Sequence, residues 1–376
     1  MERKKKKIKI LYTIPNFNTA GSGKALLNIA TRLNSNIFEP HIACFNNKGV
    51  FFKTVQRSNI PIYIYQFTYS MKYRILGLYK CFQIAKWMRK LNIDIIHSFH
   101  YAPDYSEVLS ARLAGIPWVF TKKNMNWGGK SKNGWRFRSA LSKHIIIQNI
   151  DMQKEFYPFS DKITLIQRGV DLVEFNLKVH RNLLLQSLGL PYESKIIIVV
   201  ANLVPVKGVE NLIYGFNYLD NKNYYLLIVG DDNNDYAEEL KNIASNSILM
   251  SKIKFLGKRN DINCLLKIAR VFVLPTLNKG RKEGSPVALL EAMASGVPVL
   301  ASNISGSSDI LNDMPELLYN PSKINTLVLK LEWLLTMNEI DRKSIISRQL
   351  EIINKNHTLN LEVNKHENVY LECLNP

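Results

Sequence analysis

Cysteine, long apolar runs and acidic residues are all scarce in parts of this sequence, and each shortage excludes a class of protein. The four cysteines of the 376-residue chain lie far apart and form no CxxC pair, which excludes a disulfide framework and a typical structural zinc site. The longest apolar runs, such as residues 196–200, are far shorter than the roughly 18 residues of a membrane-spanning helix, and the basic start has no apolar signal core behind it. We therefore expect a cytoplasmic protein with buried, unpaired cysteines.

Acidic residues are missing from two long windows of the first half. The formal charge is +19; residues 1–180 hold 29 Lys and Arg against 10 Asp and Glu, whereas residues 181–376 hold 21 of each kind. No acid occurs between Glu39 and Asp94 or between Glu107 and Asp151. The basic residues of these windows are interleaved with aromatic ones, including Trp87, Trp127 and Trp135. A surface of this kind attracts an anionic partner.

The hydrophobic pattern of the first half alternates between strands and helices. Residues 8–14 predict a buried strand, residues 15–24 a loop rich in Gly and Asn, and residues 25–33 a helix. Further strands are predicted at residues 41–45, 93–97, 118–121, 145–148 and 163–166, with helices at residues 76–91 and 105–113 between them. Such alternation is typical of a parallel sheet covered by helices on both faces.

A second cycle of strands and helices begins near residue 195, as expected for a chain long enough for two domains of roughly 150–200 residues. Its strands are predicted at residues 195–201, 225–229, 253–256, 271–274 and 297–301. Residues 176–193 are the predicted linker region. Residues 357–374 are predicted to form a closing helix that packs back on the first domain.

Residues 283–298 of the second half predict a site for a phosphorylated ligand. They read Glu-Gly-Ser-Pro-Val-Ala-Leu-Leu-Glu-Ala-Met-Ala-Ser-Gly-Val-Pro. Ser285 suits an N-cap and Pro286 the first position of a helix that ends at about residue 295. Because this helix follows a strand, its start is expected at the carboxyl edge of the sheet, where the free amides near Val287 and Ala288 would hold a diphosphate.

Two glutamates frame this segment. Glu283, in the loop, is placed to face sugar hydroxyls, and Glu291, about a turn and a half into the helix, is placed to accept from ribose hydroxyls. With Gly284, Ser285 and Pro286 after the first glutamate and Ala-Met-Ala-Ser-Gly-Val-Pro-Val after the second, the segment resembles the EX7E motif of glycosyltransferase family 4. The resemblance implies that this helix and its preceding loop bind the donor substrate.

Further segments of the second half resemble the same family, in the family's order. Residues 199–208 resemble the strand and loop whose basic residues neutralise the donor diphosphate; Lys207 keeps a charge there, and Asn202 stands where the family often has Arg. Residues 255–261 resemble the loop that frames the nucleobase, and Arg259 in it would also reach the phosphates. Residues 229–232 resemble a Gly-Asp-Gly turn, with Asp232 in place of the second Gly.

The first half carries weaker matches to the family. Residues 19–24 resemble the glycine loop that faces donor phosphate and acceptor, through Gly21, Ser22 and Gly23, and they depart from a Walker A motif at its first and last positions. Residues 96–100 resemble a segment near the reacting sugar, in which His100 is better placed than His97.

Two departures from the family pattern limit what can be assigned in this half. Lys123 stands where many relatives have the His of a Thr-x-His sequence, so the sequence assigns no general base. Residues 167–171 with Phe175 resemble the family's Asn-Gly-Val-Asp-x-x-x-Phe signature, with Arg168 in place of Asn, and a structural role is expected for them.

The resemblance covers nearly the whole chain and implies a GT-B fold, in which two Rossmann-like domains face each other across a cleft. Residues 1–178 would bind the acceptor, residues 179–355 the nucleotide sugar, and residues 356–376 would form a helix on the first domain. The implied activity is a retaining transfer of a hexose from a nucleotide diphosphate sugar to a hydroxyl acceptor. In this mechanism the leaving diphosphate helps deprotonate the acceptor, with Glu283, Lys207 and His100 as the catalytic residues.

The charge asymmetry predicts where this activity takes place. A membrane-borne or lipid-linked glycan in surface polysaccharide synthesis is the expected acceptor, and the basic first half would hold the protein peripherally on an anionic membrane. The predicted contact segments are residues 4–7, residues 72–90 with Tyr79 and Trp87, and residues 122–143 with Trp127 and Trp135, whose aromatic rings would lie at headgroup depth.

Three alternatives remain open at this point. A sugar-nucleotide epimerase or a phosphorylase of related fold would share the motifs, and a nucleic-acid-binding protein would share the basic half, although no recognised binding module is present. A metal site would use the loop acids Asp231, Asp232 and Asp235, but consecutive loop acids are more typical of a solvated turn. No cofactor, no metal and no specific nucleic acid is expected.

Overall fold

The structure is a computed structural model that describes residues 6–18, 20–123, 125–126, 132–219, 223–280 and 284–375. The chain divides into two compact units, residues 1–167 with residues 359–376, and residues 168–358. The chain therefore enters the second unit at Arg168, ahead of the expected boundary at residue 179, and leaves it after Thr358. No helix among the described residues is long and apolar enough to cross a membrane.

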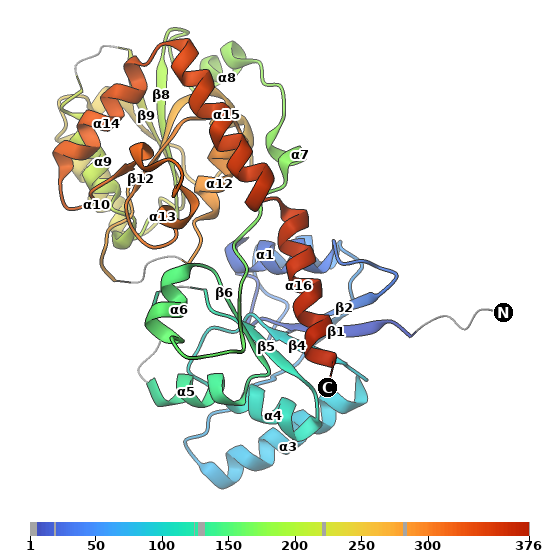
Figure 1. The fold of residues 1–376 in the computed structure, drawn as a ribbon. Coiled ribbons are helices and arrows are strands. Elements are labelled where there is room, and N and C mark those ends of the chain that lie inside the picture. Colours follow the sequence, from blue (N-terminus) through green and yellow to red (C-terminus); the bar gives the residue numbers. More distant parts are fainter. Residues whose placement is uncertain are drawn as a thin grey trace. The chain divides into compact units, whose positions relative to one another are not determined.

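A parallel sheet forms the centre of the first unit (Figure 1). In the described part of this unit it has seven strands in the order β3-β2-β1-β4-β5-β6-β7. They are β1 (Ile8–Thr13), β2 (Phe38–Cys44), β3 (Ile62–Ile64), β4 (Ile95–Ser98), β5 (Trp118–Thr121), β6 (His144–Ile147) and β7 (Ile163–Leu165). The short β3 was not predicted because its three residues are too few to show a period.

Both faces of this sheet are buried, which explains why its strands are continuous apolar runs. Ile10 and Ile95 belong to the hydrophobic core on one face, and their neighbours Leu11 and Ile96 belong to the core on the other. Successive side chains of a strand point to opposite faces, so a strand without a polar face needs cover on both sides.

Helices supply that cover. In the first unit they are α1 (Ala20–Ala30), α2 (Phe52–Gln56), α3 (Arg74–Lys90), α4 (Ser106–Ala114), α5 (Lys132–Leu141), α6 (Ile150–Phe156) and α16 (Leu359–Leu374). The predicted closing helix is α16, which packs against α1 and β4 and buries Tyr370 completely in the core of the first unit. In Figure 1, α3 and α4 lie side by side at the end of the unit away from α1.

The second unit repeats this architecture. The strand order in its described part is β10-β9-β8-β11-β12-β13, and all pairs are parallel. The strands are β8 (Lys195–Val200), β9 (Tyr224–Val229), β10 (Ile253–Phe255), β11 (Ala269–Leu274), β12 (Val299–Ser302) and β13 (Leu318–Tyr319). The four central residues of β8 are fully buried, as its Ile and Val run predicts.

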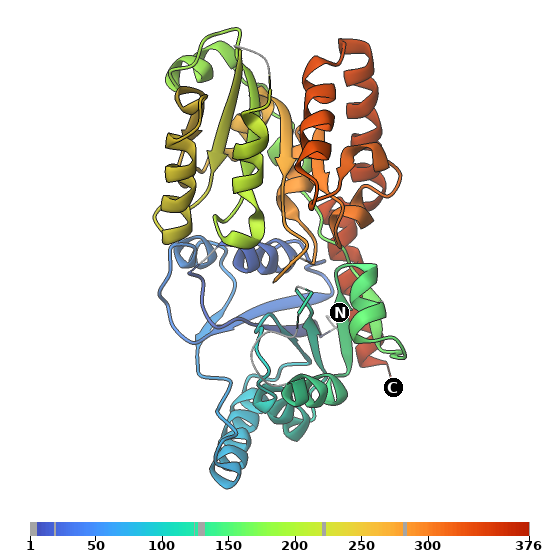
Figure 2. The same cartoon turned by 90° about the vertical axis from the view of Figure 1, so that its left-hand side faces the viewer.

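Helices lie on both faces of this second sheet (Figure 2). They are α7 (Leu172–Phe175), α8 (Arg181–Ser187), α9 (Val209–Phe216), α10 (Asp235–Ser245), α11 (Ile262–Ile268), α12 (Val287–Ala294), α13 (Ser307–Ile310), α14 (Ile324–Thr336) and α15 (Glu339–Asn356), with short 3-10 turns η1 (Pro205–Lys207), η2 (Met250–Lys252) and η3 (Pro315–Leu317). The predicted linker at residues 176–193 is wrong, because α8 lies within it and buries Leu185 in the core of the unit.

The two passages of the chain at the edge of the second unit run next to each other. Val170 forms a parallel bridge with Thr358, and its backbone N–H donates to the carbonyl of His357 over 2.8 Å. Asp171 then caps α7 by accepting from Val173 N, and Phe175 is buried in the core. The segment that matches the family signature thus ties together the entry to and the exit from this unit.

Candidate functional site

The strand order of the second sheet reverses between β8 and β11. Strands β9 and β10 lie on one side of β8, whereas β11, β12 and β13 lie on the other. Open α/β sheets bind ligands outside the carboxyl ends of the strands at such a reversal. The loops that follow β8 and β11 hold most of the predicted donor-site residues, so the topology brings them to the same sheet edge.

These two loops are in direct contact. Leu277 N donates to Val206 O over 2.8 Å. Gly208 has a φ of +61°, and a Cβ at this position would lie 2.3 Å from the carbonyl oxygen of Pro275, so only glycine fits the approach. Lys207, which precedes Gly208, ends the 3-10 turn η1 and is 7% exposed. The contact therefore fixes the backbone of Lys207 beside the loop that leads into α12.

Helix α12 begins one residue later than predicted. Its N-cap is Pro286, with φ −78° and ψ 97°, and Ser285 does not cap it. An extended ψ is usual for an N-cap residue. The turn is closely packed, because a Cβ at Gly306 would lie 3.2 Å from Pro286 Cδ and 2.9 Å from the carbonyl oxygen of Gly284. Val287 and Ala288 lead the helix, where helical geometry gives their amides no partner within the helix. They stand where an anion is favoured.

Two hydroxyl groups of the segment between β11 and α12 are buried and unsatisfied. Ser285 Oγ and Thr276 Oγ1 have no hydrogen-bond partner within the described parts of the chain. Leaving a buried hydroxyl unpaired costs roughly 1–3 kcal/mol, so such a pair marks a place where a polar ligand would complete the hydrogen bonding. Thr276, which follows β11, was missed by the sequence reasoning because no motif singles it out.

The structure gives a position for each of the remaining predicted donor-site residues of the second unit except Glu283. Glu291 is the fifth residue of α12 and is half-buried, while Asn202 is exposed after the end of β8. Glu283 lies outside the described residues. Arg259 makes a two-bond contact with Asp261, Nε to Oδ1 at 2.8 Å and Nη2 to Oδ2 at 2.6 Å, and its approach to phosphate stays a prediction.

The acidic turn after β9 forms ion pairs with lysines. Asp231 lies 2.7 Å from Lys258 Nζ, and Asp232 lies 3.7 Å from Lys241 Nζ. Asp235 opens α10, whose N-cap is the neighbouring Asn234. In the residues that the structure describes, no three His, Cys, Asp or Glu side chains are grouped as metal ligands would be.

The sheet of the first unit reverses its order between β1 and β4, and α1 follows β1 there. Gly21, Ser22 and Gly23 lie in the first turn of α1, so the predicted loop is wrong from residue 20 onward, because tertiary packing overrides the low helix propensity of glycine. Lys123, after β5, donates to Ser22 Oγ over 3.2 Å and to the carbonyl of Phe99. This lysine thus joins the start of α1 to the loop after β4.

The two histidines at the end of β4 differ in environment. His97 is fully buried; its Nδ1 lies 2.7 Å from Tyr370 Oη and its Nε2 lies 2.9 Å from Thr121 Oγ1, so it is a structural residue. His100 lies in the next loop with its side chain 12% exposed, and its Nδ1 has no hydrogen-bond partner among the described residues. His100 Nδ1 is therefore a buried nitrogen whose hydrogen bonding is incomplete in the described part of the chain.

Two family models match the chain. The one described as "Glycosyltransferase Family 4" matches residues 19–174, and the one described as "Glycosyl transferases group 1" matches residues 181–349. The first range covers most of the first unit from α1 onward, and the second range lies within the second unit and contains the β8–β11 edge. The chain belongs to glycosyltransferase family 4.

Solved structures confirm the GT-B fold of this family 4 member. A glycosyltransferase from Rickettsia africae superposes with a TM-score of 0.87 at 22% identity, over 98% of this chain and 99% of that one. Anabaena HepE in complex with UDP-glucose superposes with a TM-score of 0.79 at 19% identity, over 98% and 99%.

Characterised relatives cover less of the chain. It is 30% identical to an Escherichia coli UDP-Gal:alpha-D-GlcNAc-diphosphoundecaprenol alpha-1,3-galactosyltransferase, over 61% of this chain and 63% of that protein. It is 24% identical to a Campylobacter jejuni N,N'-diacetylbacillosaminyl-diphospho-undecaprenol alpha-1,3-N-acetylgalactosaminyltransferase, over 70% and 73%. The match to the first relative thus spans less than two thirds of its length.

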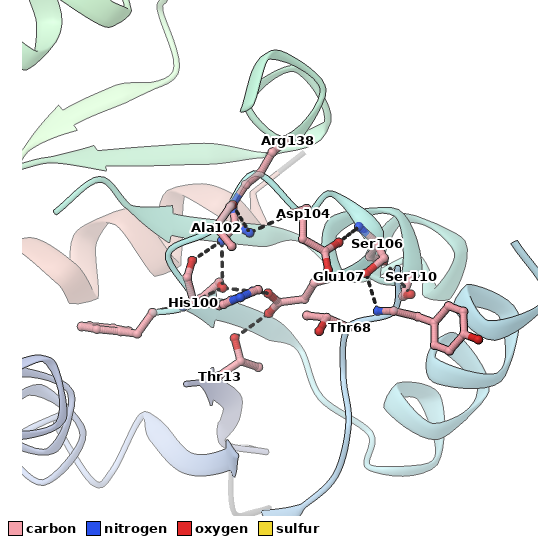
Figure 3. A network of polar contacts seen from close by, with 12 residues as sticks. Thr13, Thr68, His100, Ala102, Asp104, Ser106, Glu107, Ser110 and Arg138 are labelled. Carbon is pink, nitrogen blue, oxygen red and sulfur yellow. Dashed lines mark hydrogen bonds and ion pairs between the residues drawn. The ribbon is translucent and has the colours of Figure 1, made fainter. Parts of the chain in front are cut away.

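A buried polar network in the first unit of this transferase was missed by the sequence reasoning (Figure 3). Glu107 of α4 accepts from Thr13 Oγ1 at the end of β1 over 2.5 Å, and from Ser98 Oγ at the end of β4 over 2.8 Å. Arg138 of α5 donates to Ser98 Oγ over 3.2 Å and to the carbonyl of His100 over 2.6 Å. All of these side chains except that of His100 are completely buried. A charged residue in a predicted helix is normally read as solvent-facing, so the sequence gives little signal for the network.

Burial and nearby charge set the protonation of His100. Burial, followed by the nearby positive charges of Arg138 and Lys123, lowers the pKa of His100 from its ordinary value to about 3. Burial raises the pKa of Glu107, and the Arg138 guanidinium opposes that rise. Although His100 Nδ1 lies 3.9 Å from Glu107 Oε2, the imidazole is therefore neutral and the contact is no ion pair.

The predicted membrane contacts are partly wrong. Trp135 and Lys122 are fully buried, because the core beside β5 and α5 takes up both side chains, and Lys122 Nζ donates to the carbonyl of Asn126 over 2.8 Å. Trp87 stacks on Tyr65 with ring centroids 4.0 Å apart. Tyr79 is 59% exposed and its contact with a membrane stays a prediction, and Trp127 and residues 4–5 lie outside the described residues.

Proposed function

We propose that this glycosyltransferase moves a hexose from a nucleotide diphosphate sugar to a hydroxyl of a lipid-linked glycan, with retention at the anomeric carbon. The observation that carries the proposal is the start of α12 at the β8–β11 reversal. There, the loop that leads into α12 contacts the loop that holds the buried Lys207. A helix N-terminus and an ammonium group together suit a diphosphate.

The donor would be held by the loop and helix that follow β11. The amides of Val287 and Ala288 and the ammonium group of Lys207 would bind the diphosphate, and the unsatisfied hydroxyl of Ser285 would donate to it. Glu291 would accept from the ribose hydroxyls and Glu283 from those of the sugar. Gly284, Pro286, Asn202 and Arg259 complete the second unit's share of the proposed donor set, to which Gly21, Ser22 and Gly23 of the first unit also belong.

The chemistry needs stabilisation of a leaving anion more than a strong base. The bond between the anomeric carbon and the diphosphate breaks, the acceptor oxygen bonds to the same face of that carbon, and the acceptor proton passes to the diphosphate. Lys207 and the helix amides would stabilise the negative charge that builds up on the diphosphate. His100 is neutral and would hold the reacting groups in position by hydrogen bonding.

The acceptor side of the proposal rests on the first unit and on the relatives. Gly21, Ser22, Gly23, Lys123 and His100 lie at the β1–β4 reversal of this unit. Both characterised relatives named above act on a diphosphoundecaprenol-linked sugar and form an alpha linkage, which is the configuration that retention leaves from an alpha-linked donor. We propose a lipid-linked acceptor of surface polysaccharide synthesis, reached from the cytoplasmic side by peripheral binding to an anionic membrane.

Product analysis tests this function. The purified chain is incubated with UDP-linked and other nucleotide hexoses, with and without a prenyl-diphosphate-linked sugar acceptor, and the products are separated by chromatography and mass spectrometry. Transfer that requires the acceptor and gives an alpha linkage by NMR is expected. Interconversion of donor sugars without acceptor would instead identify an epimerase. Sequence-selective nucleic-acid retention on filters, without transfer, would identify a nucleic-acid-binding protein.

A further inference from the structure

Helix α3 has two apolar faces, and only one of them is covered. Gly77, Cys81, Ile84, Ala85 and Met88 form the covered face, which is buried where α3 packs beside α4 (Figure 1). On the outer side, Ile75 is 87% exposed, Leu78 49%, Tyr79 59% and Phe82 61%. We call these four residues the outer strip. Positions three, four and seven residues apart share one side of a helix, so the outer strip is a continuous apolar surface.

The charged residues of α3 and of the two residues before it all have the same sign. The segment from residue 72 to residue 90 contains Lys72, Arg74, Lys80, Lys86, Arg89 and Lys90, and no acid. Lys86 follows Phe82 by four residues and so continues the side of the helix that carries the strip, whereas the guanidinium of Arg89 donates to the carbonyls of Leu113 and Ala114 at the end of α4. In the described part of the chain, no ion pair involves a residue of α3.

We infer that α3 docks this protein on an anionic lipid bilayer by inserting the outer strip between the headgroups. Apolar and aromatic side chains flanked by Lys and Arg are what an interfacial helix presents to an anionic surface. A second copy of the chain fits less well, because a symmetric contact through the strip would bring two clusters of positive charge together. The inference deepens the proposed function, since a lipid-linked acceptor lies at a bilayer, and it assigns the anchoring to side chains that charge counting alone does not identify.

Vesicle flotation of the full chain, without donor or acceptor, tests the inference. Wild type is expected to float with phosphatidylglycerol–phosphatidylcholine vesicles and not with phosphatidylcholine alone. Replacing Ile75 and Phe82 by Ser should lower the partition coefficient at least about tenfold, because two side chains lose their transfer out of water. The matched control replaces Leu329 and Ile340 by Ser; these two residues are 67% and 81% exposed in the second unit. This control variant should float as wild type does.

Tyr79→Trp provides a second readout. The fluorescence emission of this variant, compared with that of wild type, should shift to shorter wavelength when the anionic vesicles are added. It should stay unchanged with the neutral vesicles. Three outcomes would overturn the inference: the Ile75→Ser, Phe82→Ser protein floats as wild type does, wild type floats equally with both kinds of vesicle, or wild type floats with neither. So would a dimer, detected by sedimentation velocity, that this double variant dissociates. Transfer to a water-soluble acceptor should be unaffected by the double variant, so a failure of the proposed transferase activity is seen separately from a failure of docking.

Discussion

Arg138 donates from Nη2 to the backbone carbonyl of His100 over 2.6 Å, so a fully buried guanidinium holds the loop that carries the proposed catalytic histidine. The same side chain donates from Nη1 to the carbonyl of Asp104 over 2.9 Å and contacts that of Ala102 at 3.4 Å. Three carbonyls of one loop therefore converge on a planar group from α5 (Figure 3). The geometry of His100 depends on this fork, which is a property of arginine and not of positive charge in general.

Arg138→Lys should separate positioning from charge. A lysine ammonium keeps a cation but does not span the three carbonyls, so we expect kcat to fall at least about tenfold with an unchanged KM for the donor. Disrupting the buried contacts should also lower the free energy of unfolding by up to roughly 3–5 kcal/mol. Arg136→Lys, at an exposed position of the same helix, is the control. A raised donor KM with wild-type kcat would contradict the positioning role.

Lys207→Ala and Glu291→Ala should each weaken donor binding. Each removes a charged hydrogen-bonding group worth roughly 1.5–3 kcal/mol, which corresponds to a rise of about tenfold to a hundredfold in the Kd of the donor. Titration calorimetry with UDP and the nucleotide sugar measures this directly, and Lys343→Ala on exposed α15 is the control. Wild-type donor affinity in either variant would remove that residue from the proposed site.

Ser285→Ala should weaken donor binding without weakening the fold. Its buried hydroxyl has no partner in the described part of the chain, so its removal breaks no hydrogen bond there and relieves the cost of burying it unpaired; we expect the free energy of unfolding to stay the same or to rise, by up to roughly 1–3 kcal/mol. The donor KM should rise about tenfold. Ser302→Ala is the opposite case, because Ser302 Oγ bonds to Tyr319 Oη at 3.0 Å, and it should lower stability more than affinity. Lower stability for Ser285→Ala with unchanged KM would assign this hydroxyl to the fold.

The sheets could be predicted from the sequence because each strand is covered on both faces. A run such as Lys195–Val200 shows this directly, and the start of α12 was located to within one residue. The buried polar network could not be predicted in the same way. Glu107 and Arg138 are stabilised by partners distant in sequence, and no local period distinguishes them from surface charges. Trp135 was misplaced for the converse reason: its basic neighbours suggested a surface, but its own ring lies in the core.

Chelation should leave the activity intact. The acids of the turn after β9 are paired with Lys258 and Lys241, and the neutralising charges assigned to the donor come from Lys207 and from helix amides. We expect transfer rates in EDTA to match those in buffer. Loss of activity in EDTA that added Mn²⁺ or Mg²⁺ restores would disprove the prediction and bring Asp231, Asp232 and Asp235 back as candidate ligands.

His100 should make the first unit less stable in mild acid. Its pKa is about 3 in the folded protein and about 6.5 in an unfolded chain, so between these values the unfolded state binds a proton that the folded state does not. This contribution is absent above pH 6.5, and it destabilises the fold progressively as the pH falls toward 3. At pH 5 it amounts to at most about 2 kcal/mol, which corresponds to a drop in Tm of roughly 4–8 °C.

His100→Gln should therefore lose less stability than wild type when the pH is lowered from 7.5 to 5, as measured by thermal unfolding at both values. His180→Gln, at an exposed position, is the control and should follow wild type. Because the folded imidazole stays neutral throughout this range, the rate of transfer should show no ionisation of His100 between pH 5 and 8. A step in the rate near pH 6.5 that disappears in His100→Gln would show that the ring is protonated in the working enzyme, and the role proposed for it as a neutral positioning group would then fail.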